Sequence, residues 1–255
     1  MLEENGLQVA AVSYDSTEIL AAFAQKHAIK FPLLSDPNSR VIRRFGIFNF
    51  NVAPDLRAYG VPHPVEYLVT PGGTVVQKYF VENYQHRVTG SAVALRQFGT
   101  VNPGAPAVTL ESGALAVRIG FASAKAFAGQ EVSFFAQFAL QPGWHIYGNP
   151  VPAGFAKTDI HFAGSNIVRQ RLDLPVASMR NFPDLREALP VYHGSFQGTG
   201  TLLLKYPLPE GRLALQGCLE FQPCSETVCE HPQTLPFELA LTLEPFLISK
   251  RDKKR

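Results

Sequence analysis

Hydrophobic positions along the first part of the chain alternate between short continuous runs and helical spacing. The run LQVAAVSY is almost entirely apolar, as expected of a strand that is buried on both faces. The next segment, DSTEILAAFAQKHAI, has capping-box spacing between Asp15 and Glu18. It therefore predicts a helix whose inward face carries Ile19, Leu20, Phe23 and His27.

The same alternation continues to residue 99. FPLLSD predicts a second strand, in which Asp36 is a cap or turn residue. NSRVIRRFG predicts a helix that ends at Gly46, with Val41, Ile42 and Phe45 directed inward. VEYLVT and TVVQKYF are joined by PGG, which predicts a hairpin, and TGSAVALRQFG predicts a final helix.

The pattern changes after residue 99. Residues 100–107, TVNPGAPA, have the composition of a linker. From residue 108 to 246 helical periodicity is nearly absent, and β-type runs are separated by breakers such as QPGW and PEG. The runs are ALAVRIGFA, EVSFFAQFAL, TDIHFAG, NIVRQRLDLP, TGTLLLKYPL, RLALQGCLEF and LPFELALTL. Such a series predicts an all-β, immunoglobulin-like sandwich. We expect residues 1–99 to form an α/β domain and residues 247–255 to be a basic tail.

Composition and charge exclude several classes of protein. The 255 residues are 46% hydrophobic and 17% charged, which fits two packed domains. The formal charge of +2 comes from the tail SKRDKKR, so the rest of the chain is near neutral, which argues against nucleic-acid binding. No apolar run is long enough to span a membrane, and MLEENGLQV lacks the features of a signal peptide.

The N-terminal half resembles redoxin and peroxiredoxin-like proteins of the AhpC/TSA type, which have a thioredoxin fold. The resemblance covers roughly residues 5–99 and is most specific at YGVPHPVEYLVTPGGTVV. It implies that Pro64 occupies the position of a cis-proline beside a reactive cysteine. Such proteins carry that cysteine on an opening strand–turn–helix, whereas this sequence has no cysteine before Cys218. We therefore expect an incomplete, N-terminally truncated thioredoxin-like domain, which cannot by itself attack a peroxide.

Two of the three cysteines lie close together in FQPCSETVCEHP. The polar loop SETV lies between Cys224 and Cys229 and is short enough to bring their Cα atoms within about 7 Å. Three interpretations remain open from the residues alone: a redox-active dithiol, a structural disulfide, or part of a zinc site with too few ligands. His231 favours a lower thiol pKa when protonated, and Glu226 and Glu230 oppose that effect.

The C-terminal half is similar to the N-terminal (alpha) domain of DsbD, a thiol–disulfide interchange family. The resemblance covers most of residues 108–245 and is carried by GWHIYGNPVPAG, VYHGSF and FQPCSETVCEHP. Gln222, Cys224, Cys229 and Pro232 fit the family's signature. It implies a pair that alternates between dithiol and disulfide, with Cys229 meeting the partner and Cys224 resolving. By position, a capping loop falls near Leu189 to Gly194, and Tyr192 of VYHGSF is a supporting residue.

Two further residues complete the candidate chemistry. Cys218 lies in the apolar run LALQGCLEF and is interpreted as a buried core residue, although a swapped disulfide with Cys224 stays open. His145 lies between Trp144 and Ile146 and is interpreted as a packed structural histidine.

The leading hypothesis is a thiol–disulfide oxidoreductase, or electron-relay protein, of the bacterial cell envelope. Its catalytic residues are Cys224 and Cys229, with Gln222, His231, Pro64 and Tyr192 in support, and it needs no cofactor or metal. Its partners are thioredoxin-like or DsbD-type redox proteins, which it meets through transient mixed disulfides. The resemblance implies a periplasmic location. One alternative is a peroxiredoxin-type antioxidant protein whose catalytic cysteine lies outside this chain, and another is a binding module with a structural disulfide.

Overall fold

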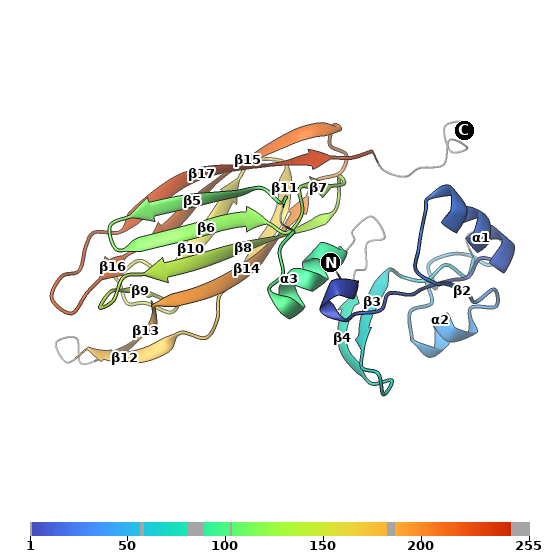
Figure 1. Cartoon of the computed structure of the whole chain (residues 1–255), viewed down its shortest axis with the longest axis horizontal. Coiled ribbons are helices and arrows are strands. Elements are labelled where there is room, and N and C mark those ends of the chain that lie inside the picture. The colour runs from blue at the N-terminus through green and yellow to red at the C-terminus, as the bar shows by residue number, and fades with distance from the viewer. Residues whose placement is uncertain (1, 57–58, 81–88, 103, 183–186, 246–255) are drawn as a thin grey trace. The chain divides into compact units, whose positions relative to one another are not determined.

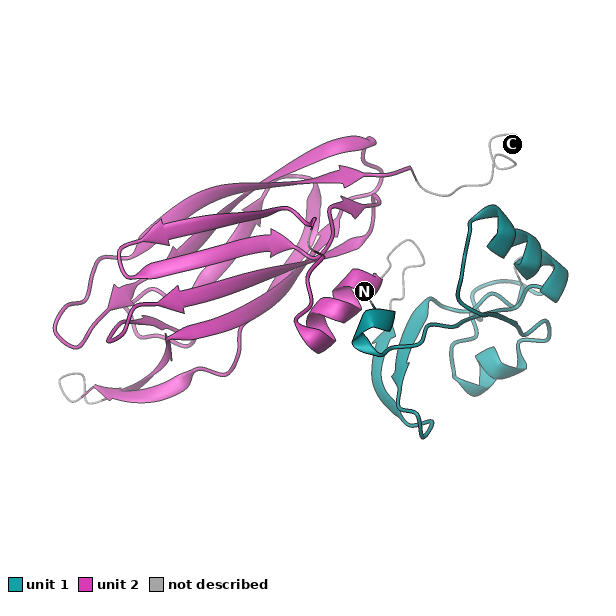
Figure 2. Cartoon of the chain, in the orientation of Figure 1, with its two compact units in different colours: residues 1–88 teal, residues 89–255 magenta. Residues whose placement is uncertain are grey.

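The computed structural model describes residues 2–56, 59–80, 89–102, 104–182 and 187–245 (Figure 1). The chain divides into two compact units, residues 1–88 and residues 89–255 (Figure 2). Among the described residues, no helix has both the length and the apolar character needed to cross a membrane.

Unit 1 follows the predicted order of strand, helix, strand, helix and hairpin. Strands β1 and β2 pair in parallel, and β3 and β4 form an antiparallel hairpin. A short 3₁₀ turn at Glu3–Asn5 precedes them. The remaining elements are β1 (Ala11–Ser13), α1 (Thr17–Lys26), β2 (Leu33–Ser35), α2 (Arg40–Arg44), β3 (Val65–Val69) and β4 (Val75–Phe80).

The first two helices have polar caps, one of which differs from the prediction. Ser16 is the N-cap of α1, and its hydroxyl accepts a hydrogen bond from the amide of Ile19. The predicted capping role of Asp15 is therefore wrong, because its carboxylate instead accepts a hydrogen bond from the Ser13 hydroxyl at 2.6 Å. The carboxylate of Asp36 accepts two amide hydrogen bonds from α2, each at 2.9 Å, which confirms its capping role.

The apolar faces predicted for unit 1 are only partly buried. Leu20 of α1 and Ile42 of α2 are buried as expected. His27 of α1 is half-buried. The inward positions predicted for Ile19, Phe23, Val41 and Phe45 are wrong, because these side chains are exposed. Val12 of β1 is exposed as well, although that strand was predicted to be buried on both faces. The physical reason is that β1 pairs with β2 alone among the described residues, so its other edge and face lack the layers that bury a central strand.

Unit 2 begins with the predicted final helix, α3 (Gly90–Phe98). The Thr89 hydroxyl accepts a hydrogen bond from the amide of Ala92, and Gly99 adopts a left-handed conformation that ends the helix. Leu95 packs with two residues of the sandwich, Ala122 and Phe135.

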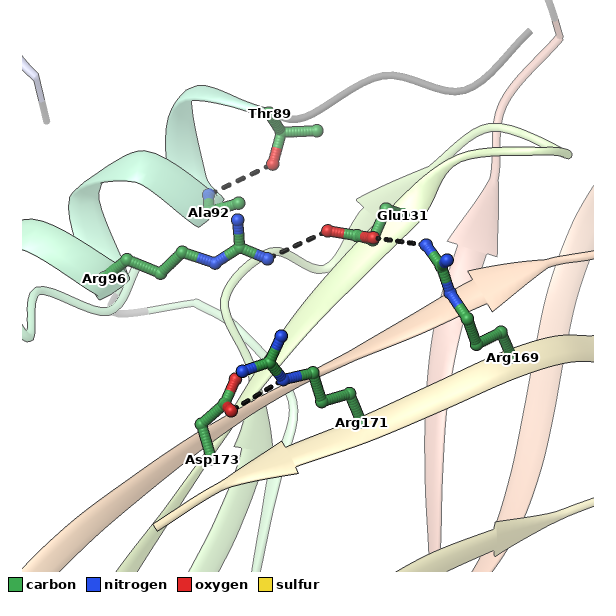
Figure 3. Close-up of polar contacts among 7 residues, drawn as sticks. All are labelled: Thr89, Ala92, Arg96, Glu131, Arg169, Arg171 and Asp173. Carbon is green, nitrogen blue, oxygen red and sulfur yellow. Dashed lines mark hydrogen bonds and ion pairs between the residues drawn. The ribbon is translucent and has the colours of Figure 1, made fainter. Parts of the chain in front are cut away.

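An ion-pair network also fastens α3 to the sandwich (Figure 3). Arg96 Nη2 lies 2.8 Å from one carboxylate oxygen of Glu131, and Arg169 Nη2 lies 3.6 Å from the other. The structure thus groups α3 with the C-terminal unit, whereas the sequence pattern predicts it to be the last helix of the N-terminal domain. The domain boundaries at residues 99 and 108 stay predictions.

The rest of unit 2 is built from three sheets (Figure 1). Five strands are ordered β11-β14-β8-β6-β5, four are ordered β10-β15-β17-β7, and four more are ordered β12-β13-β9-β16. Seven strands match the seven predicted runs; they are β6 (Leu115–Phe121), β8 (Glu131–Leu140), β10 (Asp159–Ala163), β11 (Ile167–Asp173), β14 (Ser195–Leu204), β15 (Gly211–Phe221) and β17 (Gln233–Leu243). The strands outside those runs are β5 (Ala107–Ser112), β7 (Lys125–Ala126), β9 (His145–Tyr147), β12 (Ser178–Phe182), β13 (Glu187–His193) and β16 (Pro223–Cys224).

Aromatic side chains fill the core between the two larger sheets, which are the five-stranded sheet and the sheet β10-β15-β17-β7. The ring of Phe162 packs edge-on against Phe134 and Phe237, with centroids 5.1 and 5.2 Å away. Gly200 faces Phe134 in the adjacent strand, and a Cβ atom there would overlap the ring. The strand-rich fold with this buried core confirms the predicted immunoglobulin-like sandwich.

Candidate functional site: the Cys224–Cys229 disulfide

Cys224 and Cys229 form a disulfide across a tight loop. The two residues are bridged as in an antiparallel ladder, and their Cα atoms lie 4.1 Å apart. The loop is closed by hydrogen bonds from Ser225 N to Val228 O at 2.7 Å and from Glu230 N to Pro223 O at 3.0 Å. The chain therefore turns back within the four residues SETV.

The small sheet β12-β13-β9-β16 positions the first cysteine. Cys224 of β16 lies opposite His145 of β9, and the next strand pairs Val191 of β13 with Tyr147. Because side chains alternate between the faces of a strand, one face of this sheet gathers the residues around the disulfide. That face carries Phe182, Leu189, Val191, His145, Tyr147 and Cys224.

The two sulfur-bearing residues differ sharply in exposure. Cys224 is 1% exposed and packs in an apolar cluster. The cluster consists of Tyr147, Leu189, Val191 and Cys224, with Val151, Phe155 and Phe182 packed against it. Cys229, in contrast, is exposed. A large nucleophile such as a protein thiolate thus has access to Cys229 rather than to Cys224.

Two hydrogen-bonding side chains approach the exposed cysteine. The Tyr147 hydroxyl lies 3.6 Å from Cys229 Sγ, and burial raises the pKa of Tyr147 above its ordinary value, so the hydroxyl keeps its proton. Gln222 Nε2 lies 3.8 Å from the same sulfur. Gln222 also accepts a hydrogen bond from Ala156 N at 2.9 Å and donates one to Glu230 O at 3.0 Å, which ties the loop to its surroundings.

The structure separates the other supporting candidates from the sulfurs. Tyr192 lies on the opposite face of β13, where its hydroxyl donates to Pro175 O at 2.9 Å and its ring stacks on Phe196. His231 is exposed, and within the described residues no hydrogen bond or ion pair joins it to either sulfur. Pro64 immediately precedes β3 in unit 1.

The resemblance to redoxins implied a cis peptide bond before Pro64. Among the described residues the cis bonds precede Pro150 and Pro207, so the bond before Pro64 is trans. The trans form is the default even before proline, and in this sequence no reactive cysteine lies beside Pro64 to set a local requirement for the other isomer.

The capping loop expected at Leu189 to Gly194 is a strand instead. Residues Glu187–His193 form β13, which pairs with β12 on one side and β9 on the other. Pairing on both sides holds the backbone extended, which is the physical reason the segment is not a loop. Leu189 and Val191 nevertheless cover Cys224 through their side chains.

Cys218 differs from its predicted place in the core. It is a free, half-buried cysteine on β15, between the exposed residues Gln216 and Glu220 on the outer face of the sheet. Strand alternation explains this, because the adjacent residue Leu219 takes the buried position. Burial raises the pKa of the Cys218 thiol, and the charges of Glu220 and Asp159 raise it further. The disulfide in the structure joins Cys224 to Cys229, and Cys218 is not part of it.

Sequence reasoning missed the charged residue Arg180 beside this face. Arg180 Nη2 pairs with Glu226 Oε1 at 3.2 Å, and Arg180 Nη1 lies 3.5 Å from His145 Nδ1. His145 is 1% exposed, and its Nε2 has no hydrogen-bond partner among the described residues. No local motif marks Arg180, because it reaches the loop only through the pairing of β12 with β13.

The pKa of His145 is lowered from 6.5 to about 4, first by burial and then by the charges of Arg180 and His193. The unfolded chain therefore takes up a proton at higher pH than the folded chain does. We expect the free energy of unfolding to fall as the pH drops from 6.5 towards 4, by at most about 1.4 kcal/mol per pH unit from this residue.

The variant His145→Phe isolates that contribution. Urea unfolding of the two proteins at several pH values should show a difference in stability that changes across this window and is flat above pH about 7. A constant difference at every pH would contradict the assignment of a neutral, buried His145.

The fold and the site define a class of protein: a β-sandwich that presents one exposed and one buried cysteine of a single disulfide. Residues 118–241 match the family model "Thiol:disulfide interchange protein DsbD, N-terminal", and residues 1–78 match the AhpC/TSA family model. Both matches confirm the resemblances drawn from the sequence. The first half is thus similar to a redoxin and the second half to a thiol–disulfide interchange domain.

Known proteins are similar to parts of the chain. It is 33% identical over 78 residues to the putative peroxiredoxin bcp of Haemophilus influenzae, an alignment covering 31% of this chain and 50% of that protein. The chain thus spans about half the length of the curated relative that it matches. Among solved structures, the N-terminal periplasmic domain of ScsB from Proteus mirabilis aligns with 18% identity and a TM-score of 0.40, covering 54% of this chain and 50% of that one. The reduced DsbD N-terminal domain of Neisseria meningitidis aligns with 11% identity and a TM-score of 0.30, covering 55% of this chain and 90% of that one.

Proposed function

We propose that the chain is a thiol–disulfide oxidoreductase that relays electrons through the Cys224–Cys229 pair. The observation that carries the proposal is the asymmetry of the pair: Cys229 is exposed, whereas Cys224 is 1% exposed. A permanently structural bridge does not need one sulfur presented to a partner, but exchange through a mixed disulfide does. The match of residues 118–241 to a thiol–disulfide interchange family supports the same function.

The difference in exposure supports a different role for each sulfur. A reduced partner's thiolate attacks Cys229 Sγ, the disulfide breaks, and its electron pair leaves on Cys224 as a thiolate. In the mixed disulfide, the first cysteine of the partner is bonded to Cys229. A second thiolate of the partner then attacks the sulfur of that first cysteine and releases Cys229 as a thiolate. Two electrons and, after protonation, two protons have moved from the partner to the pair. The Tyr147 hydroxyl and the Gln222 amide are placed to donate hydrogen bonds to the departing Cys229 thiolate.

The same proposal covers partners and location. Thioredoxin-like proteins have paired thiols that suit this two-step exchange, and a persistent disulfide is typical of an oxidising compartment such as the periplasm. The ScsB and DsbD structures that align with the chain are N-terminal domains, and the first is described as periplasmic.

A second candidate function is a peroxiredoxin-type antioxidant role, which the AhpC/TSA match of residues 1–78 favours. Residues 1–217 contain no cysteine, so within this sequence no thiolate of unit 1 can attack a peroxide. Reading the coding sequence upstream of Met1 for a cysteine-bearing strand and helix tests this candidate directly.

The reduction potential of the Cys224–Cys229 pair tests the main proposal. The purified chain is equilibrated with glutathione or dithiothreitol redox buffers, and the fraction of free thiol is measured by alkylation and mass spectrometry. We expect a potential within the range of exchanging pairs, between about −120 and −270 mV, and rapid reduction by a thioredoxin-like protein. A potential below about −300 mV together with no reaction would identify a structural bridge and overturn the proposal.

A further inference from the structure

The loop between the two cysteines is held at its tip by one charged residue from a distant strand. Glu226 of SETV pairs with Arg180, whose strand β12 lies at the opposite edge of the small sheet from β16. The guanidinium thus reaches across two intervening strands, β13 and β9, to the loop. Glu226 is 77% exposed and Arg180 is 38% exposed, so the pair lies at the surface beside the disulfide.

Arg180 is positioned by contacts other than Glu226. Its guanidinium carbon lies 5.5 Å from the centroid of the Phe182 ring, and its Nη1 lies 3.5 Å from Nδ1 of the buried His145. His145 is in turn fixed in β9, directly opposite Cys224. A cavity of about 640 Å³ borders the same residues, with Trp144 and His193 in its walls. Contacts that do not involve Glu226 therefore hold the Arg180 guanidinium beside the loop.

We propose that Arg180 is a positioning residue that latches the loop 225–228 and thereby sets the reduction potential of the Cys224–Cys229 pair. The inference rests on the proposed function of that pair. When the disulfide opens, Cys224 stays in strand β16 within its apolar cluster. Cys229 is then held by the loop, by the Glu230 N to Pro223 O hydrogen bond and by its contacts with Tyr147 and Gln222. An ion pair at the loop tip restricts the positions open to Cys229, which raises its effective concentration near Cys224 and favours the disulfide.

The effect of the latch is measured through the exchange equilibrium between the protein pair and glutathione. The protein disulfide and two glutathione thiols give the protein dithiol and one glutathione disulfide, with two electrons transferred. Removing the latch shifts this equilibrium towards the dithiol. Exposed ion pairs contribute about 0.2–1 kcal/mol, so we expect a shift of about 1.5- to 5-fold, or about 5–20 mV towards less negative potentials.

The experiment compares Arg180→Met, Glu226→Gln and the double variant by glutathione or dithiothreitol titration of the full chain. A latch predicts that both single variants shift in the same direction and that the double variant shifts no further, because each change breaks the same interaction. A simple effect of charge on the thiolates predicts the opposite: loss of the cation disfavours the thiolate forms and loss of the anion favours them. Shifts of opposite sign, additive shifts or no shift would each overturn the latch.

A matched ion pair controls for general effects of charge removal. Arg212 and Glu238 lie 3.0 Å apart on β15 and β17, also at the surface, and far along the strands from Cys224. Arg212→Met and Glu238→Gln should leave the potential unchanged. If the wild-type pair does not exchange at all, the proposed function fails before any variant is compared. If it exchanges and the Arg180 and Glu226 variants match the control, the latch alone fails.

Discussion

Replacing Cys224 with serine is expected to leave a protein that captures a thioredoxin-like partner as a stable mixed disulfide, whereas Cys229→Ser is expected to capture it at least about 100-fold more slowly. The reason is access: Cys229 is exposed, and Cys224 is enclosed by Tyr147, Leu189 and Val191. The probe is a thioredoxin-like protein whose single active-site cysteine carries a thionitrobenzoate group. Attack by the protein thiolate forms the intermolecular disulfide and releases coloured thionitrobenzoate, which gives the rate.

Both variants should be made in a Cys218→Ser background, because Cys218 is a free, half-buried thiol that could react slowly with the probe. The control is the Cys218→Ser protein in which the Cys224–Cys229 disulfide is intact. It should release no thionitrobenzoate from the probe. Equal rates for the two variants, or capture by neither, would contradict the assignment of Cys229 as the sulfur that meets the partner.

Truncating Phe134 to alanine is expected to lower the free energy of unfolding of unit 2 by about 3–5 kcal/mol. The Phe134 ring is 1% exposed, contacts Phe162 edge-on and fills the space above Gly200, so its removal leaves a cavity between the two larger sheets. Urea unfolding of the full chain can follow unit 2 specifically, because Trp144 is the single tryptophan of the sequence and lies in that unit.

Val168→Ala provides the matched comparison. Val168 lies on β11 of the same sheet but is 63% exposed, so its truncation should change stability by less than about 0.5 kcal/mol. Similar losses for the two variants would contradict the placement of the core between the sheets.

Much of the fold could be predicted because its signals are local. The apolar runs of unit 2 correspond to strands such as β8 and β15, and the PGG turn correctly placed the hairpin of β3 and β4. The cysteine loop was also found from sequence, since the prolines on either side of the Cys224–Cys229 segment and the mainly polar loop SETV predict a turn by themselves.

The parts that were missed depend on contacts between distant segments. Burial of Ile19, Phe23 and Phe45 was expected from helical spacing, but spacing shows only which residues share a face and not whether another layer covers it. Arg180 and Glu226 are 46 positions apart and meet because β12, β13, β9 and β16 share a sheet. The strands β9, β12 and β16 are too short or too polar to be recognised by alternation, and they are the ones that build the site.

The placement of α3 has a practical consequence for dividing the protein. A fragment that starts at residue 108, after the proline-rich segment, would lose the helix whose Leu95 covers Ala122 and Phe135 and whose Arg96 neutralises Glu131. In that fragment the apolar surface formed by Ala122 and Phe135 would be exposed to solvent. The Glu131 carboxylate would lose its ion pair with Arg96 and keep the one with Arg169. An expression fragment of the sandwich should therefore begin at or before Thr89, so that it keeps α3 together with its N-cap residue.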